Sequence, residues 1–310
     1  MNTPAYVKYS QEVELALQAK RPIVALESTI ISHGMPFPEN YRTAMGCECI
    51  IRDGGCVPAT VAILDGVIHV GLEEHELIRL AKHPENVLKA SRLDIPWLLA
   101  EKLTGAMTVA GTMIACDLAG IRTFATGGIG GVHRGAETTF DISADLEELA
   151  HTNVIVVSAG MKSILDLPKT LEYLETHGVA VLGFQTDKLP AFYNASSDLP
   201  VNYRVDRPEQ VARMFEAKQA IGLNGGIIVA NPVPEEYSFP KAKIDRAIAA
   251  AEADMKVLGI SGKATTPFLL KRISELTEGQ SLRTNIALVY NNCRLAAEIA
   301  KALNEGEEKR

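Results

Sequence analysis

A lysine stands just beyond a run of β-branched residues near the middle of the chain. In VIVVSAGMKSILDL, residues 154–167, the apolar run predicts a buried strand, and Lys162 follows its end. An ordinary lysine has a pKa of about 10.4, and lowering such a pKa by about three takes ~4 kcal/mol of differential interaction, which desolvation can supply. A neutral amine could attack an aldehyde-level carbon and form a Schiff base, whereas a solvated lysine without a catalytic role is the alternative.

A glutamate follows a second apolar run. Glu27 comes after PIVAL and before the polar stretch STIISHGMPFP. A low dielectric there would raise its pKa and keep a proton available for donation, while a core glutamate satisfied by neighbouring amides is the alternative. His33 and His133 could bind phosphate or an oxyanion, but a histidine in a turn is commonly structural, so both rank below Glu27.

A glycine-rich loop follows a third apolar run. TGGIGGVHRG, residues 126–135, has five glycines in ten positions, so its amides can approach a ligand closely and adopt positive φ. The spacing fits neither GxGxxG nor GxxxxGK[ST], which argues against a Rossmann dinucleotide site and a Walker ATP site. A ligand loop is favoured over a glycine-rich turn between core elements.

Oxygen-bearing side chains come immediately downstream, in TTFDISADLEELA. Ser or Asp at a helix start is usually an N-cap. The functional alternative makes Asp141 a hard oxygen ligand for Mg2+ or Mn2+, with water filling the other positions. In that alternative Ser143, Ala144 and Asp145 contact substrate hydroxyls.

Three further residues are weaker candidates. Lys89 could bind a phosphate as a point charge, against a default surface position. The amides near Val109 open the small-residue stretch AGTMIACDLAG and form either an anion site or a close helix contact. Asn285 lies early in an amphipathic segment, where capping is the simplest role and substrate contact the second one.

The elements that must position these residues alternate along the chain. Apolar runs predict strands at 23–26, 57–64, 67–70, 107–109, 122–125, 154–157, 179–184 and 227–230. Asp65-Gly66 is a hairpin signal. Helices are predicted at 39–53, 96–103, 168–177, 241–258, 267–277 and about 282–303. The pattern predicts a single three-layer α/β/α domain over residues 1–310, with a central mostly parallel or mixed sheet. In such sheets the ligand crevice lies beyond the carboxyl ends of the strands, where Glu27, the glycine-rich loop and Lys162 stand.

Composition excludes several classes of protein. A net charge of −7 over 310 residues argues against nonspecific binding to nucleic acid, although a small anion held by local groups fits. No apolar stretch is long enough for a membrane span and no signal peptide is visible, so we expect a cytoplasmic protein. The five cysteines include no CxxC pair and are expected to be reduced.

Long ordered blocks of the sequence resemble the pseudouridine-5'-phosphate glycosidases, also called pseudouridylate synthases. The resemblance runs from about residue 5 to 303 and is carried by VALESTIISHGMPFP, VPATVAI, TVAGTMIA, FATGGIGGVHRGAETTFDISADL, SAGMKSILDL, GLNGGIIVANP and TPFLLKRISELT. It implies a three-layer α/β/α fold, a homotrimer, a requirement for Mn2+, and reversible cleavage of pseudouridine 5'-phosphate to ribose 5-phosphate and uracil.

The resemblance also implies roles for matching positions. Glu27 corresponds to the proton donor, Lys162 to the covalent nucleophile and Asp141 to the Mn2+ ligand. Further positions correspond to substrate-binding residues, and these are Lys89, Val109 through its amide, Ser143, Ala144 and Asp145, with Asn285 as a further active-site residue. One departure is visible in FYNASSDLP, where Ala195 replaces a common arginine and Asp198 stands near a usual glycine, which bears on the conformation of that loop.

The chemistry gives Lys162 a purpose. A C–C glycosidic bond has no bridging heteroatom to protonate, so a pair of carboxylates would be a poor catalyst. The hypothesis is that Glu27 assists ring opening, Lys162 captures C1', and the nitrogen lone pair expels uracil. Alternatives are another Schiff-base phosphosugar lyase, a noncatalytic phosphosugar sensor and a phosphosugar kinase. The sequence contains no nucleotide-phosphate motif, which argues against the kinase.

Overall fold

The computed structural model describes residues 4–308 and contains one 11-stranded sheet. Nine strands follow the order β1-β4-β3-β2-β7-β8-β11-β9-β10, and β6 joins β5 to β3. The strands are β1 (Val7–Tyr9), β2 (Ile23–Leu26), β3 (Val57–Leu64), β4 (Val67–Val70), β5 (Leu88–Ala90), β6 (Gly105–Met107), β7 (Thr123–Ala125), β8 (Ile155–Ser158), β9 (Ala180–Phe184), β10 (Tyr203–Val205) and β11 (Ile227–Ala230). Only the pairs that β3 makes with β4 and β6 are antiparallel, so the sheet is mostly parallel as expected.

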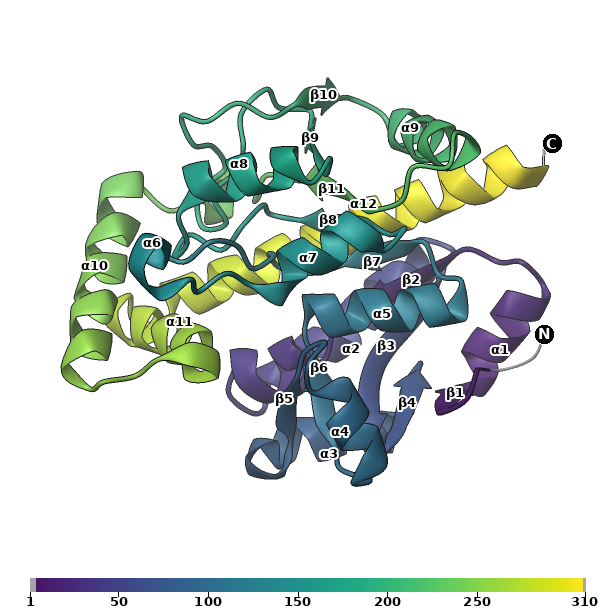
Figure 1. Ribbon diagram of the computed structural model, residues 1–310, viewed down its shortest axis with the longest axis horizontal. Coiled ribbons are helices and arrows are strands. Elements are labelled where there is room, and N and C mark those ends of the chain that lie inside the picture. The colour runs from purple at the N-terminus through teal and green to yellow at the C-terminus, as the bar shows by residue number, and fades with distance from the viewer. Residues whose placement is uncertain (1–3, 309–310) are drawn as a thin grey trace.

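Helices cover both faces of the sheet and give three layers (Figure 1). The α-helices are α1 (Gln11–Gln18), α2 (Glu39–Asp53), α3 (Glu74–Lys82), α4 (Ile95–Ala100), α5 (Val109–Ala119), α6 (Ala136–Thr139), α7 (Ala144–His151), α8 (Leu167–Thr176), α9 (Pro208–Ala220), α10 (Lys241–Val257), α11 (Thr265–Leu276) and α12 (Gln280–Glu308). Helices α5, α7 and α8 lie in front, whereas α12 runs behind the sheet and packs against α2 and α9 (Figure 1). Helices α10 and α11 pack on each other at one side of the body.

Apolar runs account for the central strands. Every residue of β2, β3, β8 and β11 is buried, as expected where helices cover both faces of parallel strands. Asp65 and Gly66 have φ of 49° and 82° and join β3 to antiparallel β4, which confirms the hairpin. The strands 23–26, 57–64, 67–70 and 227–230 and the helix 39–53 occur with the bounds that the sequence predicts.

Other elements differ from the prediction. The strand expected at 107–109 ends at Met107, because the Thr108 side chain accepts a hydrogen bond from the Gly111 amide and starts α5 at Val109. The last helix begins at Gln280 and extends to Glu308, beyond the expected 282–303. The short strands β1, β5 and β10 were not predicted, because three residues carry little periodicity.

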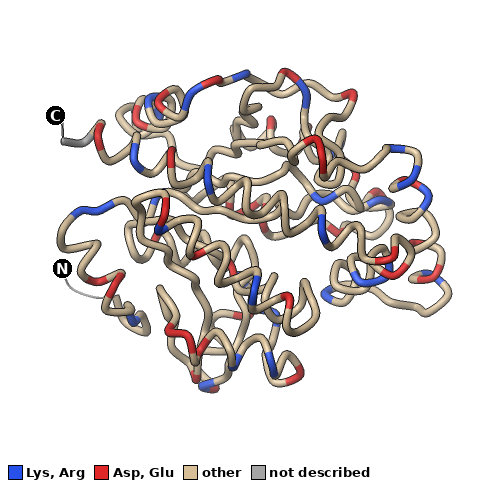
Figure 2. The backbone as a smooth tube through the Cα atoms, turned by 180° about the vertical axis from the view of Figure 1, so that it is seen from behind, with Lys and Arg blue, Asp and Glu red and all other residues tan. Residues whose placement is uncertain are grey.

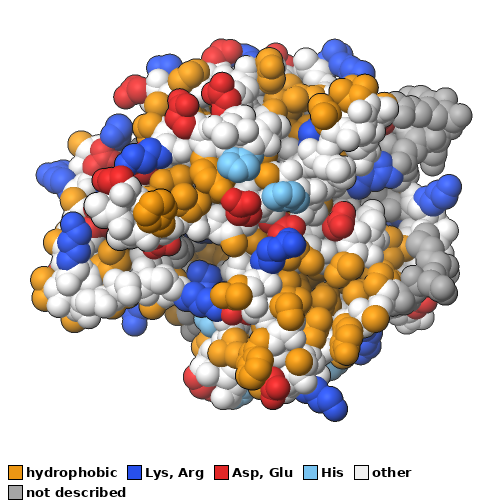
Figure 3. Space-filling model, viewed as in Figure 1, with side chains coloured by type: hydrophobic (Ala, Val, Ile, Leu, Met, Phe, Trp, Pro, Cys, Tyr) orange, Lys and Arg blue, Asp and Glu red, His pale blue; other side chains and the backbone are white. Residues whose placement is uncertain are grey.

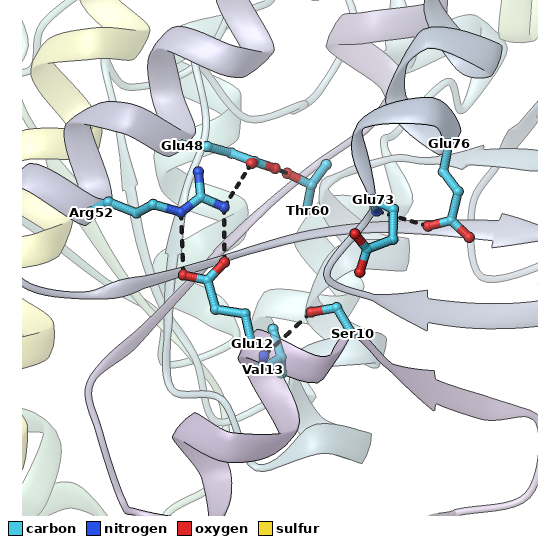
Figure 4. A network of polar contacts seen from close by, with 8 residues as sticks. All are labelled: Ser10, Glu12, Val13, Glu48, Arg52, Thr60, Glu73 and Glu76. Carbon is cyan, nitrogen blue, oxygen red and sulfur yellow. Dashed lines mark hydrogen bonds and ion pairs between the residues drawn. The ribbon is translucent and has the colours of Figure 1, made fainter.

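Charged groups fix the packing of α1 and α2 on β3. The Arg52 guanidinium of α2 contacts Glu12 of α1 at 2.9 Å and Glu48 of its own helix at 3.2 Å, and Glu48 accepts a hydrogen bond from Thr60 of β3 at 2.7 Å (Figure 4). Elsewhere acidic and basic residues alternate over the outer helices and loops (Figure 2). Within residues 4–308 no helix has the length and apolarity needed to span a bilayer.

Candidate active site

A cavity of about 360 Å3 opens where the carboxyl ends of several strands meet. All nine residues that the sequence singles out for the site line it, namely Glu27, Lys89, Val109, Asp141, Ser143, Ala144, Asp145, Lys162 and Asn285. His33 and His133 also line it. The space-filling view shows a hollow between the α11 side and the β5–β6 side, with basic side chains at its edge (Figure 3). The crevice rule for open α/β sheets therefore places the cavity correctly.

Glu27 directly follows β2 and is only 9% exposed. Thr126, at the end of neighbouring β7, donates a hydrogen bond from its hydroxyl to the Glu27 carboxylate. Burial raises the pKa of Glu27, and the charges of Lys162 and Lys89 oppose that rise from across the cavity. The raised pKa favours a protonated acid at the cavity.

The glycine-rich loop positions Lys162. The Ile129 amide donates to the Gly160 carbonyl, and the Lys162 amide donates back to the Ile129 carbonyl, both at 3.1 Å. This pairing extends the parallel contact of β7 with β8 beyond the strand ends and holds the half-buried Lys162 at the cavity. A short backbone ladder therefore fixes the lysine that the sequence selected.

Lys89 lies on the short strand β5, on the other side of the cavity. Its side chain is half-buried, which contradicts the default surface position. Burial lowers the pKa of Lys89, and the charge of Lys162 lowers it further, whereas Asp145 and Glu27 raise it. Lys89 and Lys162 therefore belong to one electrostatic site.

Asp145 lies at the start of α7, lines the cavity and connects α7 to α5 and to the glycine-rich loop. Its carboxylate accepts hydrogen bonds from the Ala110 amide of α5 at 2.9 Å and from the Gly130 amide at 2.8 Å. Ser143 is the N-cap of α7 and accepts from the Asp145 amide at 3.3 Å, so the capping alternative is confirmed for Ser143 even though it lines the cavity. Helix α5 begins at Val109, and the two amides that follow, those of Ala110 and Gly111, donate to the Asp145 and Thr108 side chains. Within the described chain this leaves the Val109 amide as the first backbone donor of the helix that is open to a ligand.

Asn285 reaches the cavity from α12. Because this helix begins at Gln280, Asn285 lies in its second turn and the capping role is wrong. The side chain is 6% exposed, and its Oδ1 has no hydrogen-bond partner in the described chain. A Cβ atom on Gly127 would lie 3.2 Å from that oxygen, so the loop can pass close to α12 only because this position is glycine.

The loop glycines act mainly through their small size. Of the five, only Gly135 has positive φ, at 84°, so the expected left-handed conformation applies to that position alone. A Cβ on Gly128 would lie 2.6 Å from the Phe192 ring, and one on Gly130 would lie 2.2 Å from the Ser143 hydroxyl. These glycines let the loop approach the cavity wall closely.

Asp141 lines the cavity next to His133, whose amide donates to the Asp141 carbonyl at 3.0 Å. No group of three His, Cys, Asp or Glu side chains suited to a metal occurs between residues 4 and 308. A single half-buried carboxylate on an open wall fits a hard cation that keeps most of its water ligands, as Mg2+ and similar ions do. It does not form a closed protein cage.

The loop with the unusual Ala195 and Asp198 is packed. The Ala195 amide donates to the Ser238 hydroxyl at 3.1 Å, and the Asp198 side chain is exposed. Neither residue lines the cavity, whereas Phe192 of the same loop does. Sequence reasoning did not select Phe192, Thr126, Asp94 or Lys263, because their positions depend on contacts between distant segments.

The fold and the cavity together define an α/β enzyme in which a buried carboxylic acid and two lysines line one cavity. The chain matches the family described as Indigoidine synthase A like protein over residues 12–302. It is 58% identical to the pseudouridine-5'-phosphate glycosidase of Hahella chejuensis over 96% of this chain and 98% of that protein. It is 57% identical to that of Caldanaerobacter subterraneus over 97% of each. The chain therefore belongs to the Indigoidine synthase A like family, alongside these pseudouridine-5'-phosphate glycosidases.

A solved structure extends the likeness to three dimensions. The prealnumycin C-glycosynthase AlnA, crystallised with ribulose 5-phosphate, superposes with a TM-score of 0.91 and is 39% identical, covering 99% of this chain and 100% of that one. The three-layer fold expected from the sequence is thus confirmed by a close relative.

Proposed function

We propose that this enzyme reversibly cleaves the C–C glycosidic bond of pseudouridine 5'-phosphate to ribose 5-phosphate and uracil. The observation that carries the proposal is the meeting of Glu27, Lys89 and Lys162 at one cavity. The names of the relatives from Hahella and Caldanaerobacter support the same reaction. The AlnA complex supports a pentose phosphate as the kind of ligand that this fold accepts.

The first chemical step uses the acid and the amine together. Protonated Glu27 gives its proton to the ring oxygen of the ribose as the bond between that oxygen and C1' breaks. The neutral amine of Lys162 forms a bond to C1', and the nitrogen then passes a proton to the Glu27 carboxylate to give a secondary amine. Burial keeps the Glu27 proton in place, since it raises the pKa of that carboxyl.

The second step releases the base. The nitrogen lone pair of the secondary amine forms a C=N bond as the bond from C1' to the uracil ring carbon breaks, and that carbon takes up the proton that Glu27 received in the first step. Water then adds to the imine and frees ribose 5-phosphate and the lysine. In this scheme the lysine nitrogen supplies the electrons that the ring oxygen supplies to C1' in the oxocarbenium-like transition state of ordinary glycoside hydrolysis.

Binding energy from the phosphate holds C1' next to the amine. Lys89 and the Val109 amide are the groups that we assign to the phosphate end, because both line the cavity and both present positive charge or a free donor. Ser143, Ala144 and Asp145 lie against the sugar, and Asn285 contacts the substrate through its unpaired amide group.

Asp141 is the residue that would hold Mn2+, with water and substrate as the other ligands. When bound, the ion would add positive charge at the anionic substrate. The family resemblance also supports a homotrimer and a cytoplasmic location.

The test is chemical trapping. Borohydride added during turnover should reduce the imine and attach the pentose phosphate to the protein, and peptide mapping should find the adduct at Lys162. Lys162→Ala should abolish both the adduct and uracil release while ribose 5-phosphate still binds. Lys188→Ala is the matched control, because Lys188 is exposed and lies outside the cavity.

Three outcomes would contradict the proposal in different ways. An adduct on another lysine would remove Lys162 from its role. Cleavage of simple sugar phosphates without cleavage of pseudouridine 5'-phosphate would indicate another Schiff-base lyase. Binding without uracil release over long incubation would indicate a phosphosugar sensor.

A further inference from the structure

The turn between α10 and α11 forms a wall of the cavity that the mechanism above does not use. Gly262, Lys263, Thr266, Pro267 and Leu270 come from this turn and the start of α11, and all of them line the cavity. Figure 1 shows the two helices standing at the side of the body, so the turn meets the site from outside the sheet. This segment is placed to contact a ligand after it has entered.

Lys263 carries the positive charge of the turn and pairs with Asp94. The Lys263 amine donates to one oxygen of the Asp94 carboxylate, and the Ser91 amide donates to the other at 3.0 Å. Ser91 and Asp94 follow β5, the strand that bears Lys89, and both line the cavity. The ion pair therefore joins the turn to the Lys89 side of the site.

The same pair of helices is attached to the Lys162 side. Arg134 of the glycine-rich loop pairs with Glu252 of α10 at 3.0 Å and donates to the Ser163 carbonyl at 3.2 Å. Ser163 directly follows Lys162. Two ion pairs thus hold the α10–α11 unit between the two lysine-bearing walls of the cavity.

Lys263 and Lys89 contribute positive charge to the same cavity. Both lysines line the cavity, and the charge of Lys263 lowers the pKa of Lys89, as the smallest of the influences on that amine. Asp94 is 19% exposed and Lys263 is 58% exposed at the side chain, so the lysine can turn away from its partner more easily than the carboxylate can move. A dianionic ligand between the two lysines would relieve their repulsion.

We propose that Lys263 is a substrate-binding residue that exchanges Asp94 for the phosphate of the ligand, so that the α10–α11 turn closes on phosphorylated pentoses and discriminates against unphosphorylated ones. The inference rests on the proposed function for its substrate class. In the ligand-free protein the Asp94 pair keeps the lysine at the cavity, and in the complex the phosphate lies between Lys89 and Lys263. The chemistry recognised is a pentose 5-phosphate dianion.

Calorimetric binding of ribose 5-phosphate to the whole protein tests this without requiring turnover. Lys263→Met should weaken binding by about 10- to 100-fold, the loss of one charged hydrogen bond, while binding of unphosphorylated ribose stays as it was. Asp94→Asn keeps an acceptor for the Ser91 amide but frees Lys263, so affinity should stay equal or rise by up to about fivefold. Lys256→Met, an exposed lysine of α10 outside the cavity, is the control.

The two variants separate exchange from a purely structural ion pair. If the pair only fixes the turn, breaking it from either side should change affinity in the same direction, and this result would overturn the proposal. A loss of affinity in Lys263→Met together with an equal or higher affinity in Asp94→Asn supports it. Amide hydrogen exchange at 258–264 should slow on addition of ribose 5-phosphate in the wild type and not in Lys263→Met. Failure of the wild type to bind ribose 5-phosphate would instead refute the proposed function.

Discussion

Two buried glutamates, one after β2 and one on α2 against the neighbouring strand β3, show how the same side chain can have different roles. Glu27 is 9% exposed at the cavity, and Glu48 is 4% exposed on α2 behind β3. Each accepts a hydrogen bond from a threonine on a strand, Thr126 and Thr60 respectively. Burial is the largest influence on both and raises the pKa of each carboxyl.

Their cationic partners differ. Glu48 contacts Arg52 at 3.2 Å, and Arg52 also binds Glu12 through two of its nitrogens (Figure 4). Glu148 repeats this arrangement, with 3% exposure, a hydrogen bond from Thr152 and an ion pair to Arg92 at 2.7 Å. Among residues 4–308 no arginine pairs with Glu27, and the positive charges that act on it are those of Lys162 and Lys89.

A structural carboxylate is held by a fixed contact with arginine, whereas a catalytic carboxylate needs space beside it for a substrate. Arginine stays charged and forms a fixed planar contact, so at Glu48 it lowers the carboxyl pKa against the rise that burial causes. At Glu27 the opposing charges belong to lysines that line the same cavity, which leaves room for a substrate beside the acid. Proton exchange with a substrate is therefore possible at Glu27, whereas Glu48 lies outside the cavity.

The largest effect that would sharpen this contrast is expected for Glu27→Gln. The amide keeps the acceptor for Thr126 but carries no transferable proton, so kcat for uracil release should fall by about 10²- to 10⁴-fold. Single-turnover release of uracil measures it. A fall of less than about threefold would show that Glu27 is as structural as Glu48.

The same variant has a stability signature with the opposite sign. Because the folded-state pKa of Glu27 is raised, the unfolded chain loses this proton first, and the wild type loses stability as pH rises from about 4 through the raised pKa. Glutamine does not titrate. Thermal unfolding of Glu27→Gln should therefore match or exceed the wild type at pH 8, with a smaller difference at pH 4.

Glu48→Ala should reverse both results. It leaves the buried Thr60 hydroxyl without its acceptor and removes one partner of Arg52, so the free energy of unfolding should drop by about 1–3 kcal/mol. Turnover per folded molecule should stay within about twofold, since Glu48 lies outside the cavity. Urea unfolding and an activity assay at low temperature give the two values, and a selective loss of kcat would erase the contrast.

Arg52→Met should have a smaller effect that depends on pH. The side chain of Arg52 is 40% exposed, so we expect a loss of about 1 kcal/mol at neutral pH. Without the arginine the folded-state pKa of Glu48 rises further, and the added loss develops as pH increases from the unfolded value of about 4.3 upward. Unfolding curves at pH 4 and pH 7 should show a small loss at the first and the full loss at the second.

Much of the sheet could be predicted from sequence because its strands are continuous apolar runs. The rule that ligands bind beyond parallel strand ends then predicts that Glu27, the glycine-rich loop and Lys162 lie together. Burial could not be predicted for Lys89, because β5 is only three residues long and its first residue is exposed. The short strand gains its place by pairing with β6.

Contacts between distant segments explain the remaining differences. Lys263 and Asp94 are 169 positions apart, and no local pattern marks either of them as part of the site. The role of Asn285 depended on where α12 begins, and helix starts are poorly fixed by sequence when no capping residue stands out. Prediction from sequence is therefore most accurate for the strands of the sheet and least accurate for the cavity residues near α10 and α11.

The smallest expected effect tests whether the lysines control Glu27 through space. Among the influences on the pKa of Glu27, the charge of Lys89 is the weakest and lowers it. Lys89→Met should therefore raise that pKa, and the loss of kcat/KM at high pH, which follows deprotonation of the acid, should begin at a higher pH than in the wild type. Lys188→Met provides the reference, because Lys188 lies outside the cavity. If the pH at which kcat/KM falls is the same in both variants, the charge of Lys89 does not affect Glu27. Another group then controls the pH dependence of kcat/KM.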